Sequence, residues 1–489
     1  MRTLVQGRRL AGLAMVAWLA VASIATAEVS LPSVIGSHMV LQRDVACPIW
    51  GWAAADEEVT VQFAGQTQKA KPDAAGKWSV SLKPLKANAQ PQKMTIKGSN
   101  TIELDDILIG EVWLCSGQSN MEWSVAASNN PQEEASAANH PRIRHIKIPH
   151  RPSDKPESNV PSTGWTVCTP QSVPQFTAVG YYFGRKLMND LDVPVGLIGS
   201  NWGGTRIEPW TPPEGFKAVP ALKEAFADKL DQFPQKNKVA DKNDPKKVTE
   251  VINHQSALAL YNGMIHPLVP YAIRGSIWYQ GESNNGEGML YTEKMKALIA
   301  GWRTVWNNPD MPFLFVQLAP YNYGPMRTEQ LPGIWEAQEA ALSIPNTGMA
   351  VTTDIGNIKD IHPKNKQEVG RRLALWALAK TYGKQDVIFS GPVYREMKVE
   401  ANKVRLSFDH TAGGLTSRDG NALTEFTIAG EDNKFVPAKA EIDGDSVVVS
   451  AAEVAKPTAV RFGWQQLAEP NLANKAGLPA SPFRTDKGK

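Results

Sequence analysis

Cysteine is scarce in this chain. Its 489 residues include only Cys47, Cys115 and Cys168, which allow one disulfide at most and leave a thiol over. A disulfide-rich scaffold is therefore excluded. The sequence also has no CxxC pair and no histidine pair at ligand spacing, so we expect no metal site. Cys115 has no base near it in sequence, and we interpret it as a buried strand residue.

Long apolar runs are missing too, apart from one near the start. Three arginines precede the apolar run 10–24, and the small residues 25–27 follow it. This pattern predicts a signal peptide over residues 1–27 and an exported protein, periplasmic or secreted. A membrane anchor is the alternative, but the run falls short of the roughly 20 residues that span a bilayer.

The chain has no excess charge of either sign once that segment is removed. Lys and Arg total 52, of which three lie in residues 1–27, so the remainder equals the 49 Asp and Glu. We therefore expect neither a nucleic-acid surface nor a basic membrane patch, and no membrane partner after signal cleavage. An uncharged polar substrate such as a sugar fits this balance. Oligomeric state is not indicated.

The two ends of the chain carry the period-two alternation of exposed strands. Residues 28–104 contain short runs such as 59–63 and 78–82, separated by Gly, Pro, Asp and Asn, which predict a small β-sandwich. Residues 391–489 return to the same pattern, for example at 404–408. A carbohydrate-binding module and a plain structural cap are both compatible with these β regions.

Residues 105–390 instead alternate short apolar runs with helical patterns. Such alternation predicts an α/β fold with a mainly parallel sheet. The lysine-rich and proline-rich stretch 212–253 is interpreted as a solvated helical excursion. The strands are expected at 107–114, 193–198, 273–279, 313–318 and 347–353, and the helices at 178–191, 294–306, 335–343 and 364–382.

Four polar segments follow predicted strands, where reactive groups gather in open α/β sheets. They span residues 116–121, 200–206, 280–284 and 354–363. Ser119 stands in the first segment at a strand-to-helix turn, which can expose a nucleophile, although Ser and Asn are also ordinary turn residues.

The other three segments offer partners for a reactive serine. The second holds the pair Gly203-Gly204, which can present backbone N–H groups or make a simple tight turn. The third holds Gln280 and Asn284 as possible amide donors, with Glu282 expected to brace the loop. The fourth holds His362, with two aspartates in the eight residues before it. Together these segments supply a nucleophile, oxyanion donors and an acid–histidine pair.

In their order, the four segments resemble the four blocks of the SGNH hydrolase superfamily. More narrowly, the chain resembles the sialate O-acetylesterase family and its relatives that deacetylate plant polysaccharides. The matching stretches run from Met39-Val40-Leu41-Gln42 through 113–121, 260–265, 278–283 and 360–366 to 477–484. The resemblance implies a three-layer α/β sandwich, the SGNH hydrolase-like fold, with accessory β regions at both ends.

By this resemblance Ser119 is the nucleophile and one oxyanion donor, and His362 is the base. Gly203 or Gly204 matches the glycine donor, and Gln280 stands where many members have an asparagine as third donor. The acid departs from the superfamily pattern, because Asp360 lies two residues before the histidine rather than three. Asp354 is the rival acid, and a Ser–His dyad aided by a backbone carbonyl is the third option.

The resemblance implies acyl transfer on an acetylated carbohydrate, either a sialic acid or a plant polysaccharide such as xylan or xyloglucan. No metal or organic cofactor is needed. Four tryptophans near the site segments could stack on sugar rings, although core packing is the commoner use: Trp123, Trp202, Trp210 and Trp278. A glycan-binding protein without activity is the alternative. A lipase or peptidase is disfavoured because no lid-like segment or Gly-x-Ser-x-Gly elbow is present.

Overall fold

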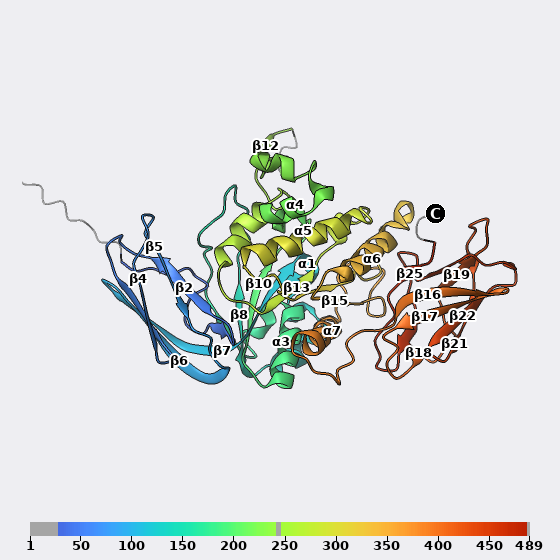
Figure 1. Cartoon of the computed structure of the whole chain (residues 1–489), viewed down its shortest axis with the longest axis horizontal. Helices are drawn as coiled ribbons and strands as arrows, with labels where there is room; N and C mark the ends of the chain where they lie inside the picture. The colour runs from blue at the N-terminus through green and yellow to red at the C-terminus, as the bar shows by residue number, and fades with distance from the viewer. Residues whose placement is uncertain (1–27, 241–245, 487–489) are drawn as a thin grey trace, which may run out of the picture.

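The computed structural model describes residues 28–240 and 246–486. The predicted signal peptide, residues 1–27, lies outside the described residues. The molecule is elongated, with an α/β body in the centre and a β region at each end (Figure 1). This is the α/β sandwich with two accessory β regions that the sequence predicts.

The central sheet is mainly parallel and runs in the order β15-β14-β13-β7-β10-β8-β9. Strand β9 alone among these pairs antiparallel to its neighbour. β10, β13 and β14 are buried along their whole length, as expected of strands covered on both faces. The strands are β7 (Thr101–Gly117), β8 (His140–Lys147), β9 (Thr166–Cys168), β10 (Val195–Asn201), β13 (Gly275–Tyr279), β14 (Phe313–Val316) and β15 (Thr347–Ala350).

Helices cover both faces of this sheet and complete three layers (Figure 1). α3 (Ala178–Leu191) and α7 (Lys366–Trp376) pack on one face, and α4 (Pro213–Ala218), α5 (Leu290–Val305) and α6 (Gln330–Ala340) lie on the other. The predicted bounds of α3 are confirmed. Its start is fixed by Thr177, whose side chain accepts the Gly180 N–H, as an N-cap residue does. A short helix, α2 (Pro131–Ser136), precedes β8.

Strand β7 runs across the boundary predicted between residues 104 and 105. The adjacent Asp105 and Asp106 have the composition of a turn, but the strand passes through them. Asp106 adopts a positive φ of 57°, and its carboxylate accepts hydrogen bonds from Arg144 and His38. The ion pair with Arg144 therefore stabilises this distorted position within β7. The N-terminal β region shares β7 with the central sheet.

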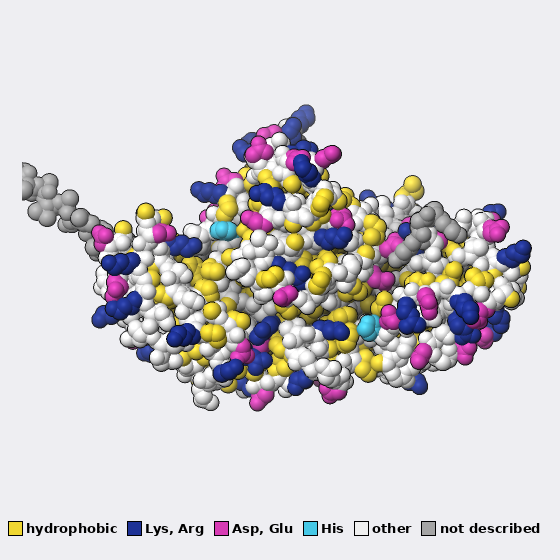
Figure 2. Space-filling model, in the orientation of Figure 1, with side chains coloured by type: hydrophobic (Ala, Val, Ile, Leu, Met, Phe, Trp, Pro, Cys, Tyr) yellow, Lys and Arg dark blue, Asp and Glu magenta, His cyan; other side chains and the backbone are white. Residues whose placement is uncertain are grey.

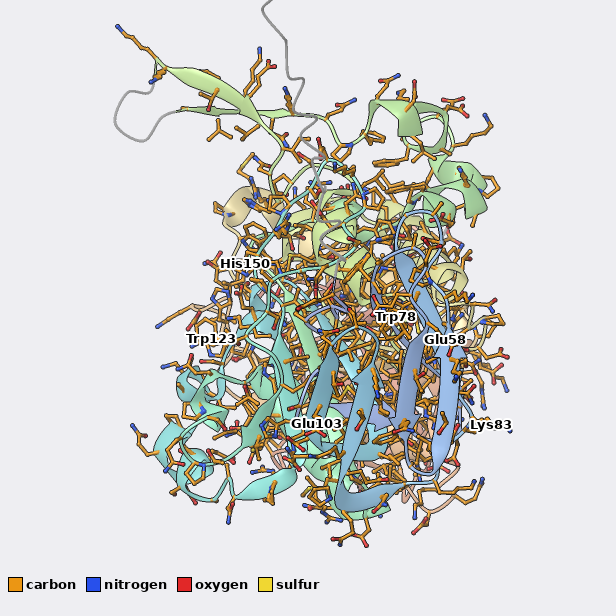
Figure 3. The ribbon with its side chains drawn as sticks, turned by 90° about the vertical axis from the view of Figure 1, so that its left-hand side faces the viewer. Glu58, Trp78, Lys83, Glu103, Trp123 and His150 are labelled. Atoms are coloured by element: carbon orange, nitrogen blue, oxygen red, sulfur yellow. The ribbon has the colours of Figure 1, made fainter. Side chains whose placement is uncertain are left out.

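The rest of the N-terminal region is a small β structure around β7. Its hydrophobic core is continuous with that of the α/β body. Figure 3 views this end of the molecule, with Trp78 among the strands and Glu58, Lys83 and Glu103 labelled around it. The strands are β1 (Val40–Gln42), β2 (Cys47–Trp52), β3 (Val59–Phe63), β4 (Gln66–Ala70), β5 (Lys77–Leu82) and β6 (Asn88–Lys97).

The C-terminal β region has a hydrophobic core of its own. It comprises two four-stranded sheets and a two-stranded one. The first contains β16 (Val393–Glu400), β17 (Lys403–Asp409), β22 (Ser446–Ser450) and β21 (Lys439–Asp443), and the second β20 (Val436–Pro437), β19 (Phe426–Ala429), β23 (Ala459–Phe462) and β25 (Phe483–Arg484). The third pairs β18 (Leu415–Ser417) with β24 (Leu472–Asn474).

The excursion at 212–253 is partly helical, as expected, but it ends in a hairpin that the sequence does not predict. β11 (Asn237–Ala240) and β12 (Val248–Val251) pair antiparallel. Seven of their eight residues are exposed, so no apolar face marks them as strands in the sequence.

Two surface properties bear on membrane and nucleic-acid binding: the length of the helices and the distribution of charge on the face in view. Within 28–240 and 246–486, every helix is too short or too polar to cross a bilayer. Acidic and basic side chains alternate over the face shown in Figure 2.

Candidate active site

Ser119 and His362, which lie 243 residues apart, meet at the carboxyl end of the central strand. Ser119 begins the short helix α1 (Ser119–Glu122) directly after β7. Its Oγ lies 2.8 Å from Nε2 of His362, which stands in the loop between β15 and α7. This distance is a hydrogen bond between a hydroxyl and an imidazole nitrogen, the arrangement in which a base can activate a serine.

A glycine makes this turn possible. Gly117 ends β7 with a φ of 135°, and a Cβ built on it would lie 2.2 Å from the carbonyl oxygen of Tyr279. A side chain at Gly117 would therefore separate β7 from β13. Because β13 stays close, the Gln118 N–H donates to that same carbonyl at 2.9 Å, and Ser119 is held at the edge of the sheet.

The two candidate acids have different partners. Oδ1 of Asp360 lies 3.9 Å from Nδ1 of His362, and the same oxygen accepts the backbone N–H of His362 at 2.9 Å. Asp354 instead forms a two-pronged ion pair with Arg372, with both N···O distances at 2.7 Å. Asp360 is thus the carboxylate that faces the imidazole, at ion-pair rather than hydrogen-bond distance.

The ring of His362 is also held by an aromatic neighbour. Trp123 stacks on it with ring centroids 4.6 Å apart and an angle of 17° between the planes. Trp123 is fixed in turn because its indole N–H donates to the Ala127 carbonyl at 2.7 Å. The imidazole is therefore oriented by Ser119, Trp123 and the Asp360 turn together.

The surroundings of His362 favour its neutral form. Burial lowers its pKa from the ordinary value, and the nearby charge of Lys366 lowers it further, while Asp360 acts in the opposite direction. A neutral imidazole can accept a proton, which is what a general base needs.

The glycine pair lies beside the serine, and one of its N–H groups is already engaged. A Cβ built on Gly203 would lie 3.2 Å from the Ser119 Cβ, so a side chain there would crowd the serine. The Gly203 N–H donates to Oε2 of Glu122 at 2.7 Å. Gly204 has a positive φ of 72°, and no heavy atom lies within 4 Å of a Cβ built on it.

Glu122 joins this turn to a histidine on the loop after β8. Its Oε1 lies 2.9 Å from Nε2 of His150. Burial alone would raise the pKa of the Glu122 carboxyl, but the hydrogen bonds from His150 and Gly203 bring it below the ordinary value. Glu122 is therefore ionised at neutral pH, next to the proposed oxyanion donors. Figure 3 labels Trp123 and His150 on the same flank of the molecule.

Gln280 does not lie in the site as a free donor, which corrects the expectation for it. Its side chain is fully buried, and its amide donates to the Thr205 carbonyl at 3.1 Å and to Oδ1 of Asn284 at 2.7 Å. Its Oε1 accepts from the Tyr291 hydroxyl. Both amide hydrogens are used, so Gln280 holds the surrounding loops rather than an oxyanion.

The structure adds a buried group that sequence reasoning missed. Asn120, next to the nucleophile, donates to Oε1 of Glu282 at 2.5 Å and to the Ile361 carbonyl at 3.0 Å. Its Oδ1 accepts from Nζ of Lys366 at 2.5 Å. Glu282 thus braces the loop, as expected, and Asn120 ties the serine turn to the residue before His362.

Both ionisable members of this group are shifted by their surroundings. Burial lowers the pKa of Lys366 to about 7, and burial raises the pKa of Glu282. The signal in the sequence was the position of Lys366, four residues after His362 and at the start of α7. A lysine there places its side chain back over the preceding loop, but an exposed lysine is the commoner outcome.

The four tryptophans near the site serve packing and positioning. Trp210 and Trp278 are buried, so the core interpretation is right for them. The Trp202 ring stacks with His150 and with His254, at ring-centroid distances of 4.2 and 5.1 Å. Trp123 already covers His362. The described surroundings of these rings give no support to a sugar-stacking role for them.

The described residues contain no cluster of metal ligands and no disulfide. In residues 28–240 and 246–486, no three His, Cys, Asp or Glu side chains gather as metal ligands would. The three cysteines are free and buried. Burial raises the pKa of Cys47 and of Cys168 to about 12, so neither is a nucleophile at neutral pH.

Comparison with known proteins agrees with this architecture. Residues 109–379 match the family model described as carbohydrate esterase, sialic acid-specific acetylesterase. Sialate O-acetylesterases of Rattus norvegicus and Homo sapiens are each 30% identical, the matches covering 92% and 93% of this chain and 93% of each relative. A solved carbohydrate acetylesterase from Xanthomonas citri is 37% identical with a TM-score of 0.84, covering 94% of this chain and 100% of its own. The chain therefore belongs to the sialic acid-specific acetylesterase family of carbohydrate esterases, and it is an ester hydrolase.

Proposed function

We propose that this protein removes acetyl groups from carbohydrate hydroxyls through an acyl-enzyme, with Ser119 as nucleophile and His362 as base. The observation that carries the proposal is the 2.8 Å contact between Ser119 Oγ and His362 Nε2 at the carboxyl end of β7. The similarity to sialate O-acetylesterases and to a carbohydrate acetylesterase supports acetyl esters as the bond attacked.

In the first half of the reaction, Ser119 Oγ attacks the ester carbonyl carbon while Nε2 of His362 takes its proton. The tetrahedral oxyanion is stabilised by the Ser119 N–H and by the Gly203-Gly204 turn. Because the Gly203 N–H donates to Glu122, we assign the role of second oxyanion donor to the Gly204 N–H. Collapse breaks the bond to the sugar oxygen, which leaves as a hydroxyl with the proton from His362.

In the second half, water takes the place of the sugar. His362 accepts a proton from the water as it attacks the acetyl-serine, and returns that proton to Oγ when acetate leaves. Asp360 faces Nδ1 of His362 and stabilises the imidazolium that forms in both halves. No step requires a metal or an organic cofactor.

The substrate class is an acetylated sugar, either a sialic acid or a plant polysaccharide such as xylan or xyloglucan. The alternative raised by the sequence, a glycan-binding protein without activity, conflicts with the esterase family to which the chain belongs. It is disfavoured because Ser119 and His362 are in hydrogen-bond contact, and a binding module has no need of that contact. Acetate release from acetylated sialic acids, xylo-oligosaccharides and xyloglucan fragments would identify the sugar.

Replacing the nucleophile gives the sharpest test. Ser119→Ala should lower kcat on a chromogenic acetate ester by about 10³-fold or more, because the attacking oxygen is removed. A fluorophosphonate probe should label the wild-type protein at Ser119 and leave the variant unlabelled. Full activity in Ser119→Ala would end the proposal, and intact glycan binding without any labelling would favour the binding module.

A further inference from the structure

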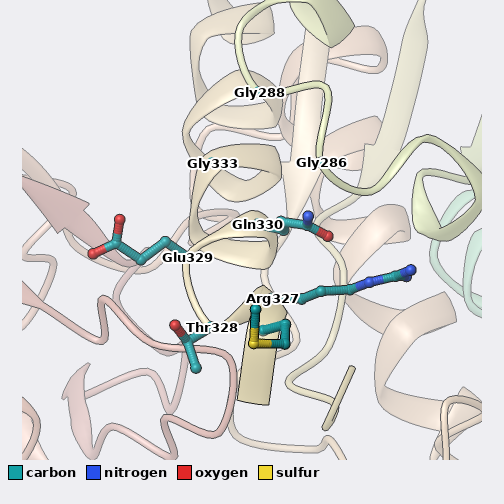
Figure 4. A pocket seen from close by; sticks show the side chains of 8 residues that line it. Gly286, Gly288, Arg327, Thr328, Glu329, Gln330 and Gly333 are labelled. Carbon is teal, nitrogen blue, oxygen red and sulfur yellow. The ribbon is translucent and has the colours of Figure 1, made fainter. Parts of the chain in front are cut away.

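A cavity lies on the same edge of the sheet as the candidate site, where the loops after β13 and β14 leave their strands. Its volume is about 400 Å³, within the range of small-ligand pockets. Its walls are the loop after β13 and the loop that leads from β14 into α6 (Figure 4). The lining residues are Gly286, Gly288, the run 326–330 and Gly333.

The lining combines one apolar side chain with one cation, one anion and neutral polar groups. Met326 is 92% exposed, and Arg327, Thr328, Glu329 and Gln330 supply donors and acceptors around it. The Arg327 and Gln330 side chains point to one side of the view in Figure 4, and Glu329 points to the other. One cation and one anion give the lining no net charge, which suits a neutral ligand carrying both hydroxyls and C–H faces.

Both walls are joined by hydrogen bonds to the loops that hold Ser119 and His362. The first wall begins at Glu282, whose carboxylate accepts from Asn120 beside the nucleophile. The second wall contains Asn322, whose N–H donates at 3.1 Å to the Ile358 carbonyl in the histidine loop. A ligand spanning the candidate site and this cavity would therefore cross adjoining loops.

One residue of the C-terminal β region fixes the second wall. Gln466 is buried, with 3% of its surface exposed. Its backbone carbonyl and side-chain oxygen accept the N–H groups of Tyr321 and Tyr323, at 3.0 and 2.9 Å. Its side-chain amide donates to the Gly324 carbonyl at 2.9 Å, and its backbone N–H donates to the Thr328 carbonyl at 3.3 Å. Four hydrogen bonds thus hold a surface loop from outside its own domain.

We propose that this cavity is a sugar-binding subsite for a neutral part of the glycan that carries the acetyl ester. In it, Met326 meets the C–H face of a ring, and Arg327, Thr328 and Gln330 bind hydroxyls. The C-terminal β region keeps the subsite formed through Gln466. This inference rests on the proposed carbohydrate esterase function, and it gives the C-terminal region a role in substrate binding.

Two variants test the subsite by different routes. Gly333→Leu would place a side chain in the cavity without a clash at its base, since a Cβ there lies 3.7 Å from the nearest heavy atom, the Gly288 Cα. Gln466→Ala would release two of the four bonds on the loop. The matched control is Gln465→Ala, because Gln465 is exposed and its side-chain amide donates within the C-terminal region, to Glu425.

The readout is the ratio of kcat/KM on an acetylated xylo-oligosaccharide or xyloglucan fragment to kcat/KM on a small chromogenic acetate ester. Each test variant should lower this ratio about 10-fold, mainly through KM, because a sugar that is excluded from the subsite, or that meets a displaced loop, loses one or two hydrogen bonds to the protein. Gln465→Ala should leave the ratio unchanged. An unchanged ratio in both test variants would overturn the subsite, whereas a wild-type protein that deacetylates no glycan would overturn the proposed function instead.

Discussion

The two ends of the loop between β15 and α7 carry similar residues and have different surroundings. At one end Asp354 binds Arg372 of α7 at two points, and the two side chains are 6% and 4% exposed. At the other end Asp360 is 40% exposed and lies 3.9 Å from the His362 ring. A carboxylate whose hydrogen bonds are used by a buried arginine holds the structure, whereas one left half-exposed beside an imidazole is available to catalysis.

The largest effect is expected at the buried end. Asp354→Asn leaves the buried Arg372 guanidinium with Glu368, 3.4 Å from its Nε, in place of a two-pronged partner, and breaking a buried pair from one side typically destabilises a protein by about 3–5 kcal/mol. We expect a loss of about that size in the free energy of unfolding, measured with urea, and little change in kcat for the molecules that remain folded. Asp386→Asn, on the exposed surface, is the control. A large drop in kcat at unchanged stability would make Asp354 the triad acid.

A smaller effect, on rate rather than stability, is expected at the exposed end. Asp360→Asn removes a negative charge about 4 Å from the imidazolium, an interaction worth roughly 1–4 kcal/mol near a protein surface. We expect kcat to fall about 10-fold to 100-fold while the urea midpoint stays where it is. That loss is smaller than the roughly 10⁴-fold typical of a triad whose carboxylate bonds directly to the imidazole. A kcat equal to wild type would leave the Ser–His dyad as the mechanism.

The positions of the catalytic candidates could be inferred from sequence because residues that follow parallel strands lie at one edge of the sheet. Ser119 and His362 each follow a strand of one parallel sheet, and the carboxyl ends of such strands meet at one edge. The bounds of α3 were equally accessible, since its buried positions recur four residues apart. Periodicity therefore places distant segments at strand ends, and the family resemblance singles out Ser119 and His362 among their residues.

The direction of individual side chains could not be inferred in this way. Gln280 follows its strand as predicted, but Asn284 and the Thr205 carbonyl take its hydrogens. The Gly203 N–H is likewise taken by Glu122. Each outcome depends on a partner from a loop whose own path is set by tertiary packing, and a single sequence does not contain that information. The continuity of β7 was hidden for the same reason, because Arg144 neutralises Asp106 from another strand.

The smallest effect is expected at Lys366, which links the histidine loop to the serine turn. Activity requires neutral His362, so kcat/KM should fall as the pH drops through the pKa of His362, which burial and then Lys366 lower. Lys366→Met removes the effect of the Lys366 charge on this pKa and leaves the effect of burial. The pKa should therefore rise, and the acid limb of the pH profile should move to higher pH by less than about one unit, equivalent to about 1.4 kcal/mol. Lys364→Met is the matched control, because Lys364 is exposed two residues earlier and solvent screens its charge. A limb that stays in place in Lys366→Met, with the fold intact, would mean that Lys366 holds Asn120 without tuning the base, and the loop would then act on His362 through Asp360 alone.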